Sequence, residues 1–367
     1  MTLERYIGRD VSDLPTPIVV IDLPTVVRNA RRMADHASRL DVGLRPHWKT
    51  TKAAEAARLQ LDAGAVGHTA ATGAELAVLA SGVSPSVFLA YPPVGDERVR
   101  AVLGAARSAE VIVGVDSVES VRELSAACVA EGRVVRVRLD VDTGLGRTGV
   151  DPGNALAVAR GIASLPGLSL DGVWTHEGHV QGKGADEEAR RTTGVAAGQL
   201  LVEVARALRA DGLAINDVSV GSTAGVWSAP TVPGVTEARP GTYILGDENQ
   251  VAIGTILESD VAVEVHSRVV STQRRSVAIV DAGLKALSSD GSLHGDGRVG
   301  TIVSACGGIV SVAHEEHGFL RGAEGVRVGD VVRIRPNHAC GVMNMHSAVV
   351  AAEDGVVVDV WPILARH

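Results

Sequence analysis

Aromatic residues are scarce in this 367-residue chain: they make up 2% of it, although hydrophobic residues together make up 46%. A core of ordinary size must therefore consist mainly of Ala, Val, Leu and Ile. Cysteine is also rare. The three cysteines, Cys128, Cys306 and Cys340, lie far apart and form no CxxC pair, which argues against a disulfide framework.

An excess of positive charge is absent as well. The formal net charge is -8 and no long basic run occurs, which argues against a nucleic-acid partner. No apolar run approaches the roughly 18 residues of a membrane-spanning helix. The start, "MTLERYIGRD", alternates charges where a signal peptide has an apolar stretch. We expect a cytoplasmic protein with a small-molecule partner and no membrane partner.

What the chain does contain, from Pro17 to about Gly246, is an alternation of short β-branched runs with longer Ala/Leu/Arg segments. Such alternation is typical of repeated βα units. Eight such units favour a TIM-type (β/α)8 barrel, an α/β fold, over an open doubly wound sheet. The predicted strands are Leu44–Lys49, Val66–Ala71, Val87–Tyr91, Val111–Val115, Val134–Val141, Leu170–His176, Asp217–Gly221 and Thr236–Leu245.

After Gly246 the pattern changes to short strands separated by turns, as in "VAVEVHSRVVS" and "VGDVVRIRPNHAC". This indicates a separate, mainly β domain. We therefore predict a barrel over residues 17–246 and a β domain over residues 247–367. Residues 1–16 are expected to pack on the β domain.

The segment "LRPHWKTTK" places Lys49 at the end of the first predicted barrel strand. Barrels collect their catalytic groups at the carboxyl ends of strands. Burial lowers the pKa of a lysine from about 10.4, so that a neutral amine becomes available to attack a carbonyl. The alternative is a lysine whose ammonium group reaches solvent.

Two loops rich in small residues follow the last two predicted barrel strands: "GSTAG" at Gly221–Gly225 and "RPGTY" at Arg239–Tyr243. Loops in these positions often bind phosphate through backbone amides, to which hydroxyl groups add donors. Each loop alone is also compatible with an ordinary turn. A phosphate site opposite a strand-end lysine is what pyridoxal phosphate requires.

In "RPNHACGVMNMH", His338 and Cys340 lie two residues apart. On a strand they would point to the same face, as a chelating pair needs. Imidazole with thiolate suits zinc and does not exclude manganese. Without a metal, the pair would be a polar histidine and a small buried cysteine.

Two further segments carry titratable groups at predicted strand ends. "WTHEGH" contains His176, Glu177 and His179, one of which could act as a general base or simply cap the strand. Arg147, in "RLDVDTGLGRTG", could pair with a carboxylate or the cofactor ring, or form a surface ion pair.

The segments "RPHWKTTK", "RLDVDTGLGRTG", "THEGH", "VGSTAG", "TEARPGTYILGD", "DAGLKALSSDG", "HEEHG" and "PNHACGVMNMH" together resemble the D-threonine aldolase and D-serine dehydratase family. That family resembles alanine racemase in fold and uses pyridoxal phosphate and a divalent metal. The resemblance implies that Lys49 binds the cofactor, that His338 and Cys340 hold zinc or manganese, and that the protein is a homodimer. It also implies contacts to the cofactor phosphate from Gly221, Ser222, Thr223, Gly241 and Thr242, with Tyr243 beside the phosphate or ring.

Signals within the family conflict. His338-x-Cys340 resembles the dehydratases, as "GSTAG" also does, whereas Gly178–His179 resembles the aldolases. We predict a lyase for D-3-hydroxy amino acids of the D-threonine aldolase type, in which His179 removes the hydroxyl proton and Cα–Cβ cleavage gives glycine and an aldehyde. The alternatives are a D-serine/D-threonine dehydratase, giving a 2-oxo acid and ammonia, and an amino-acid racemase.

Overall fold

The computed structural model describes residues 2–366 and divides them into two compact units. One unit, called here the barrel unit, contains residues 31–49 and 57–241; the rest of the described chain forms the second unit. The helices α1, Leu23–Arg39, and α2, Ala54–Asp62, are each divided between the two.

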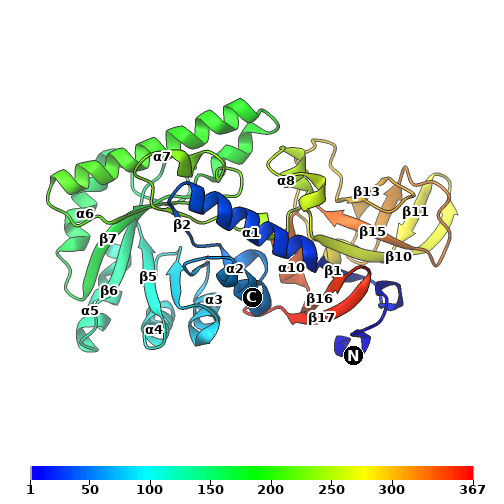
Figure 1. Cartoon of the computed structure of the whole chain (residues 1–367), viewed down its shortest axis with the longest axis horizontal. Helices are drawn as coiled ribbons and strands as arrows, with labels where there is room; N and C mark the ends of the chain where they lie inside the picture. Colours follow the sequence, from blue (N-terminus) through cyan, green and yellow to red (C-terminus); the bar gives the residue numbers. More distant parts are fainter. Residues whose placement is uncertain (1, 367) are drawn as a thin grey trace. The chain divides into compact units, whose positions relative to one another are not determined.

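The barrel unit contains eight parallel strands in the order β2-β9-β8-β7-β6-β5-β4-β3. Figure 1 labels β2, β5, β6 and β7 of this sheet. The edges of this sheet meet: His47 forms a parallel bridge with Thr69, and the Val66 amide donates to the Leu44 carbonyl at 2.8 Å. The predicted (β/α)8 barrel is thereby confirmed. Its strands are β2 Gly43–Leu44, β3 His68–Ala70, β4 Ser86–Leu89, β5 Glu110–Val115, β6 Val135–Asp140, β7 Leu168–Trp174, β8 Asp217–Val220 and β9 Glu237–Ala238.

Two helices of this unit, α3 and α7, begin at a side-chain cap. Thr72 accepts a hydrogen bond from the Glu75 amide at the start of α3, and Asp186 accepts one from the Ala189 amide at the start of α7. A side-chain oxygen at this position satisfies an amide that has no partner within the helix. The helices are α3 Gly73–Val78, α4 Asp96–Ala105, α5 Arg122–Ala130, α6 Ala155–Ala163 and α7 Glu187–Ala210.

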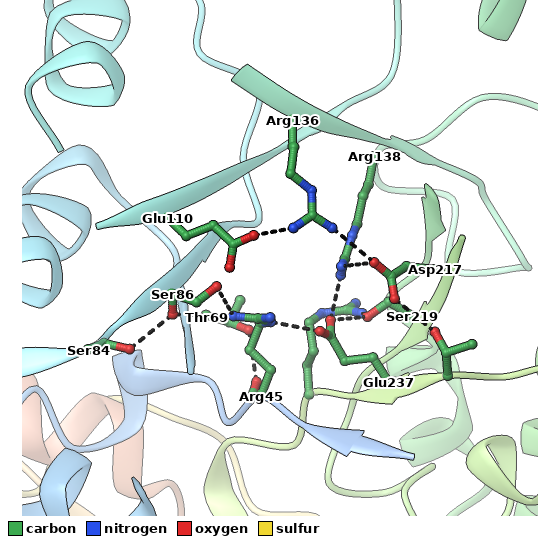
Figure 2. A network of polar contacts seen from close by, with 12 residues as sticks. Arg45, Thr69, Ser84, Ser86, Glu110, Arg136, Arg138, Asp217, Ser219 and Glu237 are labelled. Carbon is green, nitrogen blue, oxygen red and sulfur yellow. Dashed lines mark hydrogen bonds and ion pairs between the residues drawn. The ribbon is translucent and has the colours of Figure 1, made fainter. Parts of the chain in front are cut away.

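A network of charged side chains fills the amino-terminal part of the barrel interior (Figure 2). At its centre is Glu237, which accepts hydrogen bonds from Arg45 at 2.7 Å, Arg138 at 2.7 Å and Ser219 at 2.6 Å. Arg138 also pairs with Asp217 at 2.5 Å. These side chains occupy positions that branched apolar residues fill in most barrels of this type.

The charges in this network balance one another. Burial by itself raises the pKa of Glu237, but the guanidinium groups of Arg45 and Arg138 lower it to about 2. The carboxylate is therefore ionised at neutral pH. Breaking a buried ion pair leaves the partner's charge without compensation, which is far more destabilising than breaking an exposed pair.

We predict that Glu237→Gln, which keeps the shape and removes the charge, lowers the free energy of unfolding by about 3–5 kcal/mol because Arg45 and Arg138 lose their counter-charge. Urea unfolding at pH 7 measures this. The control is Glu188→Gln, which breaks an exposed pair with Arg191 and should unfold at nearly the wild-type urea concentration. Equal midpoints for the two variants would contradict a structural role of the network.

The second unit is built on a nine-stranded sheet in the order β11-β14-β13-β12-β15-β10-β1-β16-β17. Because β11 also pairs with β10, the first six strands of this order form a closed antiparallel barrel. The strands are β1 Ile18–Asp22, β10 Val263–Arg274, β11 Val277–Val280, β12 Gly300–Ile302, β13 Ile309–Ala313, β14 Gly318–Arg321, β15 Val331–Pro336, β16 Ala348–Glu353 and β17 Val356–Pro362; the helices are α8 Glu248–Ala252, α9 Leu284–Leu287 and α10 Ala339–Met345.

The range predicted for the barrel began at residue 17, whereas the structure places β1 in the sheet of the second unit. Val20 of β1 pairs with Glu264 of β10 on one side and with Val350 of β16 on the other. Tyr6 and Leu14, from the segment before β1, pack in the same apolar cluster as Val20. The residues before the first helix thus belong to the β unit because their apolar side chains are buried there.

None of the helices within residues 2–366 is both long enough and apolar enough to cross a membrane.

Candidate functional site

The carboxyl ends of the parallel strands form one rim of the barrel, and most of the predicted site residues follow those ends. Lys49 lies in a short 3-10 helix, Trp48–Thr50, after β2, and it is partly buried. Arg147 follows β6, His176 follows β7, and Gly221 follows β8. Gly241 follows β9 at the end of the barrel unit.

These side chains share one electrostatic environment. Burial lowers the pKa of His176 to about 3. The contact with the Gly221 carbonyl by itself raises this pKa, whereas the charges of Lys49 and Arg147 lower it further. Burial and the Lys49 charge also hold the pKa of His47 well below its usual value. Both imidazoles are therefore neutral at pH 7. One small cleft at this rim is lined by Asp140, Val141, Asp142, Leu145, Arg147, Thr148, Thr175 and His176.

Two of the three titratable residues after β7 brace the loop that begins at Gly221. Nδ1 of His176 contacts the Gly221 carbonyl oxygen. The buried carboxylate of Glu177 accepts hydrogen bonds from the Gly221 amide at 2.8 Å and from the Ser222 hydroxyl at 3.0 Å. Burial raises the pKa of Glu177, against the effect of these hydrogen bonds.

The third residue, His179, has no such role. It lies in the 3-10 helix Gly178–Lys183, and its Nδ1 atom is buried without a hydrogen-bond partner among residues 2–366. Burial lowers the pKa of His179, although the Asp142 carboxylate opposes the shift. Gly144, at φ +128°, lies against the ring, where a Cβ would come within 3.3 Å of Nε2. His179 is thus not used to hold the loop that begins at Gly221.

The predicted phosphate loop is formed in part as expected. Gly221, Ser222 and Thr223 lie together after β8, and all three are buried. The single hydroxyl hydrogen of Ser222 is directed at Glu177, and its oxygen accepts from the Gly225 amide at 2.9 Å. Sequence reasoning missed this use of Ser222, because nothing in the motif indicates that a buried carboxylate stands behind the loop.

The segment around His338 departs from the prediction. A strand was expected through Cys340, but β15 ends at Pro336, His338 precedes α10, and Cys340 lies in the first turn of that helix. The strand prediction was wrong here because the Ala339 amide donates to the Asp247 carboxylate at 3.1 Å and so leaves the sheet ladder. The two side chains nevertheless lie close enough for Cys340 to affect the pKa of His338.

Asp247 is the neighbour that sequence reasoning missed in the second unit. It is fully buried, and its Oδ2 atom lies 2.9 Å from Nδ1 of His338. Burial opposes a charge on this imidazole, but Cys340 and Asp247 together raise the pKa of His338 to about 11. The only signal in the sequence was the position of Asp247 in "YILGDENQ", where it could cap a helix.

The donors in this unit suit a divalent metal. With Nδ1 of His338 held by Asp247, Nε2 and the Cys340 sulfur remain as an N,S pair, which zinc accepts. No group of three or more potential metal-ligating side chains occurs within residues 2–366. A metal held by this pair would keep positions for a substrate, which is typical of catalytic sites.

One predicted phosphate contact, Thr242, lies beside Cys340 in the second unit. The Cys340 thiol donates to the Thr50 hydroxyl at 3.3 Å, and the Thr242 hydroxyl is 4.0 Å from the sulfur. Thr50 directly follows Lys49 in the sequence. Tyr243, next to Thr242, is buried.

Comparison with known proteins decides the family. Residues 21–249 match the family described as "Alanine racemase, N-terminal domain", and residues 262–352 match a "Putative serine dehydratase domain". The chain belongs to the alanine racemase-like family of D-threonine aldolases and D-serine dehydratases. The resemblance noted in the sequence is therefore confirmed.

Individual relatives in this family carry both types of activity. The chain is 32% identical to a D-threonine aldolase of Arthrobacter sp, covering 98% of this chain and 94% of the relative. It is 33% identical to a D-threo-3-hydroxyaspartate dehydratase of Delftia sp., covering 94% and 96%. The crystal structure of a D-threonine aldolase from Filomicrobium marinum matches with a TM-score of 0.91 at 28% identity, covering 98% of each chain. These relatives are lyases.

Asp140, at the end of β6, makes the stability of the barrel unit depend on pH. It is buried, and burial raises its pKa to about 6 from 3.8, although the Thr148 hydroxyl donates to it at 2.9 Å. A raised carboxyl pKa means that the folded state holds the proton more tightly than the unfolded state. Stability therefore falls as the pH rises between about 4 and 6.

We predict that Asp140→Asn removes this loss, so that in cofactor-free protein the variant gains up to about 3 kcal/mol relative to wild type between pH 4 and pH 7. Urea unfolding at several pH values measures the difference. Asp142→Asn is the control with the opposite sign, because backbone amides of Gly144, Leu145 and Gly146 lower the pKa of Asp142. The same trend in both variants would contradict the assignment.

Proposed function

We propose that this chain is a pyridoxal-phosphate- and divalent-metal-dependent lyase for D-3-hydroxy amino acids, which cleaves the Cα–Cβ bond to glycine and an aldehyde. Lyases of this kind are among its relatives. The observation that supports the aldolase reaction best is His179, whose buried ring nitrogen has no partner among residues 2–366.

The cofactor would be held at the barrel rim. Lys49 would bind it covalently, Gly221, Ser222, Thr223 and Gly241 would contact its phosphate, and Arg147 its ring. Thr242 and Tyr243 continue the second phosphate loop in the sequence. The fit rests on a partly buried lysine beside neutral imidazoles, together with an unpartnered buried ring nitrogen on His47. When bound, pyridoxal phosphate supplies an electron sink for charge that develops at Cα.

The metal would be held by His338 and Cys340, and zinc and manganese both fit. Its chemistry is that of a Lewis acid toward the β-hydroxyl group of the substrate. His179 would then remove the hydroxyl proton. Because burial lowers the pKa of His179, the ring is neutral at pH 7 and can accept a proton.

A second candidate is a dehydratase, and Cys340 is the observation that favours it. A cysteine-to-alanine variant of a D-threo-3-hydroxyaspartate dehydratase has been solved in a metal-free form, at 32% identity and a TM-score of 0.89, with 97% of this chain and 99% of that chain covered. In a dehydratase Lys49 would take the α-proton, and the products would be a 2-oxo acid and ammonia. A racemase would use the barrel rim without a metal.

We further propose that the protein is a cytoplasmic homodimer.

The reaction is tested by incubating the protein, loaded with pyridoxal phosphate and Mn²⁺ or Zn²⁺, with D-threonine and identifying products by proton NMR. Glycine and acetaldehyde are expected because, in the proposed reaction, His179 would take the hydroxyl proton. L-threonine is the control and should not react. Formation of 2-oxobutanoate would establish the dehydratase instead, and L-allo-threonine, formed by inversion at Cα alone, as sole product would establish a racemase.

The cofactor lysine is tested by borohydride reduction of the loaded protein followed by peptide mass spectrometry. The pyridoxyl label is expected on Lys49. Lys52 is an internal control in the same segment, because its ammonium group donates to Asn344 and to the Ala365 carbonyl. Label on Lys52 instead would overturn the assignment. His179→Gln should keep the label and lower kcat by about 10²-fold or more.

A further inference from the structure

We propose that Asp247 is a positioning residue for the metal: its carboxylate holds Nδ1 of His338, which fixes the tautomer that presents Nε2 to the ion. This inference rests on the proposed function, since it concerns the metal pair His338 and Cys340. It assigns a role to a residue outside that pair.

The carboxylate divides its two oxygens between two tasks. Oδ1 accepts the Gln250 amide at 2.9 Å and so caps α8. Oδ2 accepts the Ala339 amide at 3.1 Å and lies 2.9 Å from His338 Nδ1. A residue that only capped a helix would need the first oxygen alone. The second oxygen ties the imidazole and the start of α10 to one fixed point.

Burial makes this arrangement rigid. Asp247 is 0% exposed, so water does not compete for its oxygens. The Ala339 amide next to His338 is held by the same oxygen, which also fixes the backbone that carries the imidazole. A carboxylate on the far nitrogen of a metal-binding histidine orients the ring and raises its basicity, and its loss typically weakens metal binding 10- to 100-fold.

The charge of Asp247 is also matched to the proposed ion. On binding, the metal would displace the proton from Nε2 of His338 and the proton of the Cys340 thiol. The pair would then supply one neutral nitrogen and one thiolate, so that the protein contributes a single negative charge directly. Asp247 adds a second charge through the imidazole without occupying a coordination position. This leaves positions open on the ion, which fits the absence of a third candidate ligand within residues 2–366.

The test is a zinc titration of full-length, chelator-treated protein against a chromophoric zinc indicator. Asp247→Asn keeps an oxygen to cap α8 and removes the acceptor for the imidazole, so a 10- to 100-fold weaker zinc affinity is expected. Replacing zinc by Co²⁺ should still show a thiolate-to-cobalt band in the variant, because Cys340 is unchanged. Thermal unfolding of the metal-free proteins checks that the variant folds.

Asp22→Asn is the matched control. Asp22 likewise accepts the amide three residues on, that of Thr25, at 3.1 Å at the start of α1. This variant should bind zinc as wild type does. If Asp247→Asn does not fold, Asp247→Ser replaces it, because serine also caps helices and lacks the carboxylate.

A folded Asp247→Asn or Asp247→Ser protein with wild-type zinc affinity would overturn the proposal. So would an equal loss of affinity in Asp22→Asn, which would point to general destabilisation. Failure of the proposed function is a separate outcome: wild type would then bind zinc and cobalt as expected, and lose affinity on substitution of Asp247, without converting D-threonine.

Discussion

The ion pairs of Glu237 with Arg45 and Arg138 are the constraint on which the barrel depends. Strand β9 contributes only two residues, yet the carboxylate of the first connects it to the residue after β2 and to β6. Few aromatic side chains are available to fill the interior, and long guanidinium side chains take up that volume. The packing of the barrel is therefore electrostatic to an unusual degree, and each charge requires its partner.

This charged layer continues toward the rim. Arg239, which follows β9, donates to the Thr175 carbonyl at 2.6 Å and lies over the rings of Phe88 and Trp174 at 5.3 and 5.2 Å. Burial lowers the pKa of Arg239 to about 10, although Glu237 opposes the shift. Because Thr175 precedes His176, the position of the rim histidine is coupled to the charges beneath it.

Both units use a buried carboxylate in the same way. Glu177 accepts the Gly221 amide and the Ser222 hydroxyl, and Asp247 accepts the Ala339 amide and the His338 imidazole. In each case one carboxylate fixes a backbone segment and a polar side chain together. Neither residue would contact substrate, yet both determine where the contacting groups lie.

The sequence was sufficient to predict the eight barrel strands, because each alternates with a helical segment. It was also sufficient to predict that Lys49, Arg147 and His179 lie in the segments that follow barrel strands. It was not sufficient for contacts between distant segments. A β-branched run such as Ile18–Asp22 has the same composition in a parallel barrel as in an antiparallel sheet, so its partners could not be deduced. His338-x-Cys340 fits a strand by spacing, and only the distant Asp247 shows why a helix begins there instead.

The pairing of β1 has a consequence for the order in which the chain can fold during synthesis. Val20 pairs with Val350, so the first strand to leave the ribosome must wait until nearly the whole chain has been made before its neighbour β16 exists. Until β10 has been made, its apolar residues have no native partner in the sheet at all. The barrel unit, whose residues all precede Thr242, can form while the amino-terminal segment is still waiting.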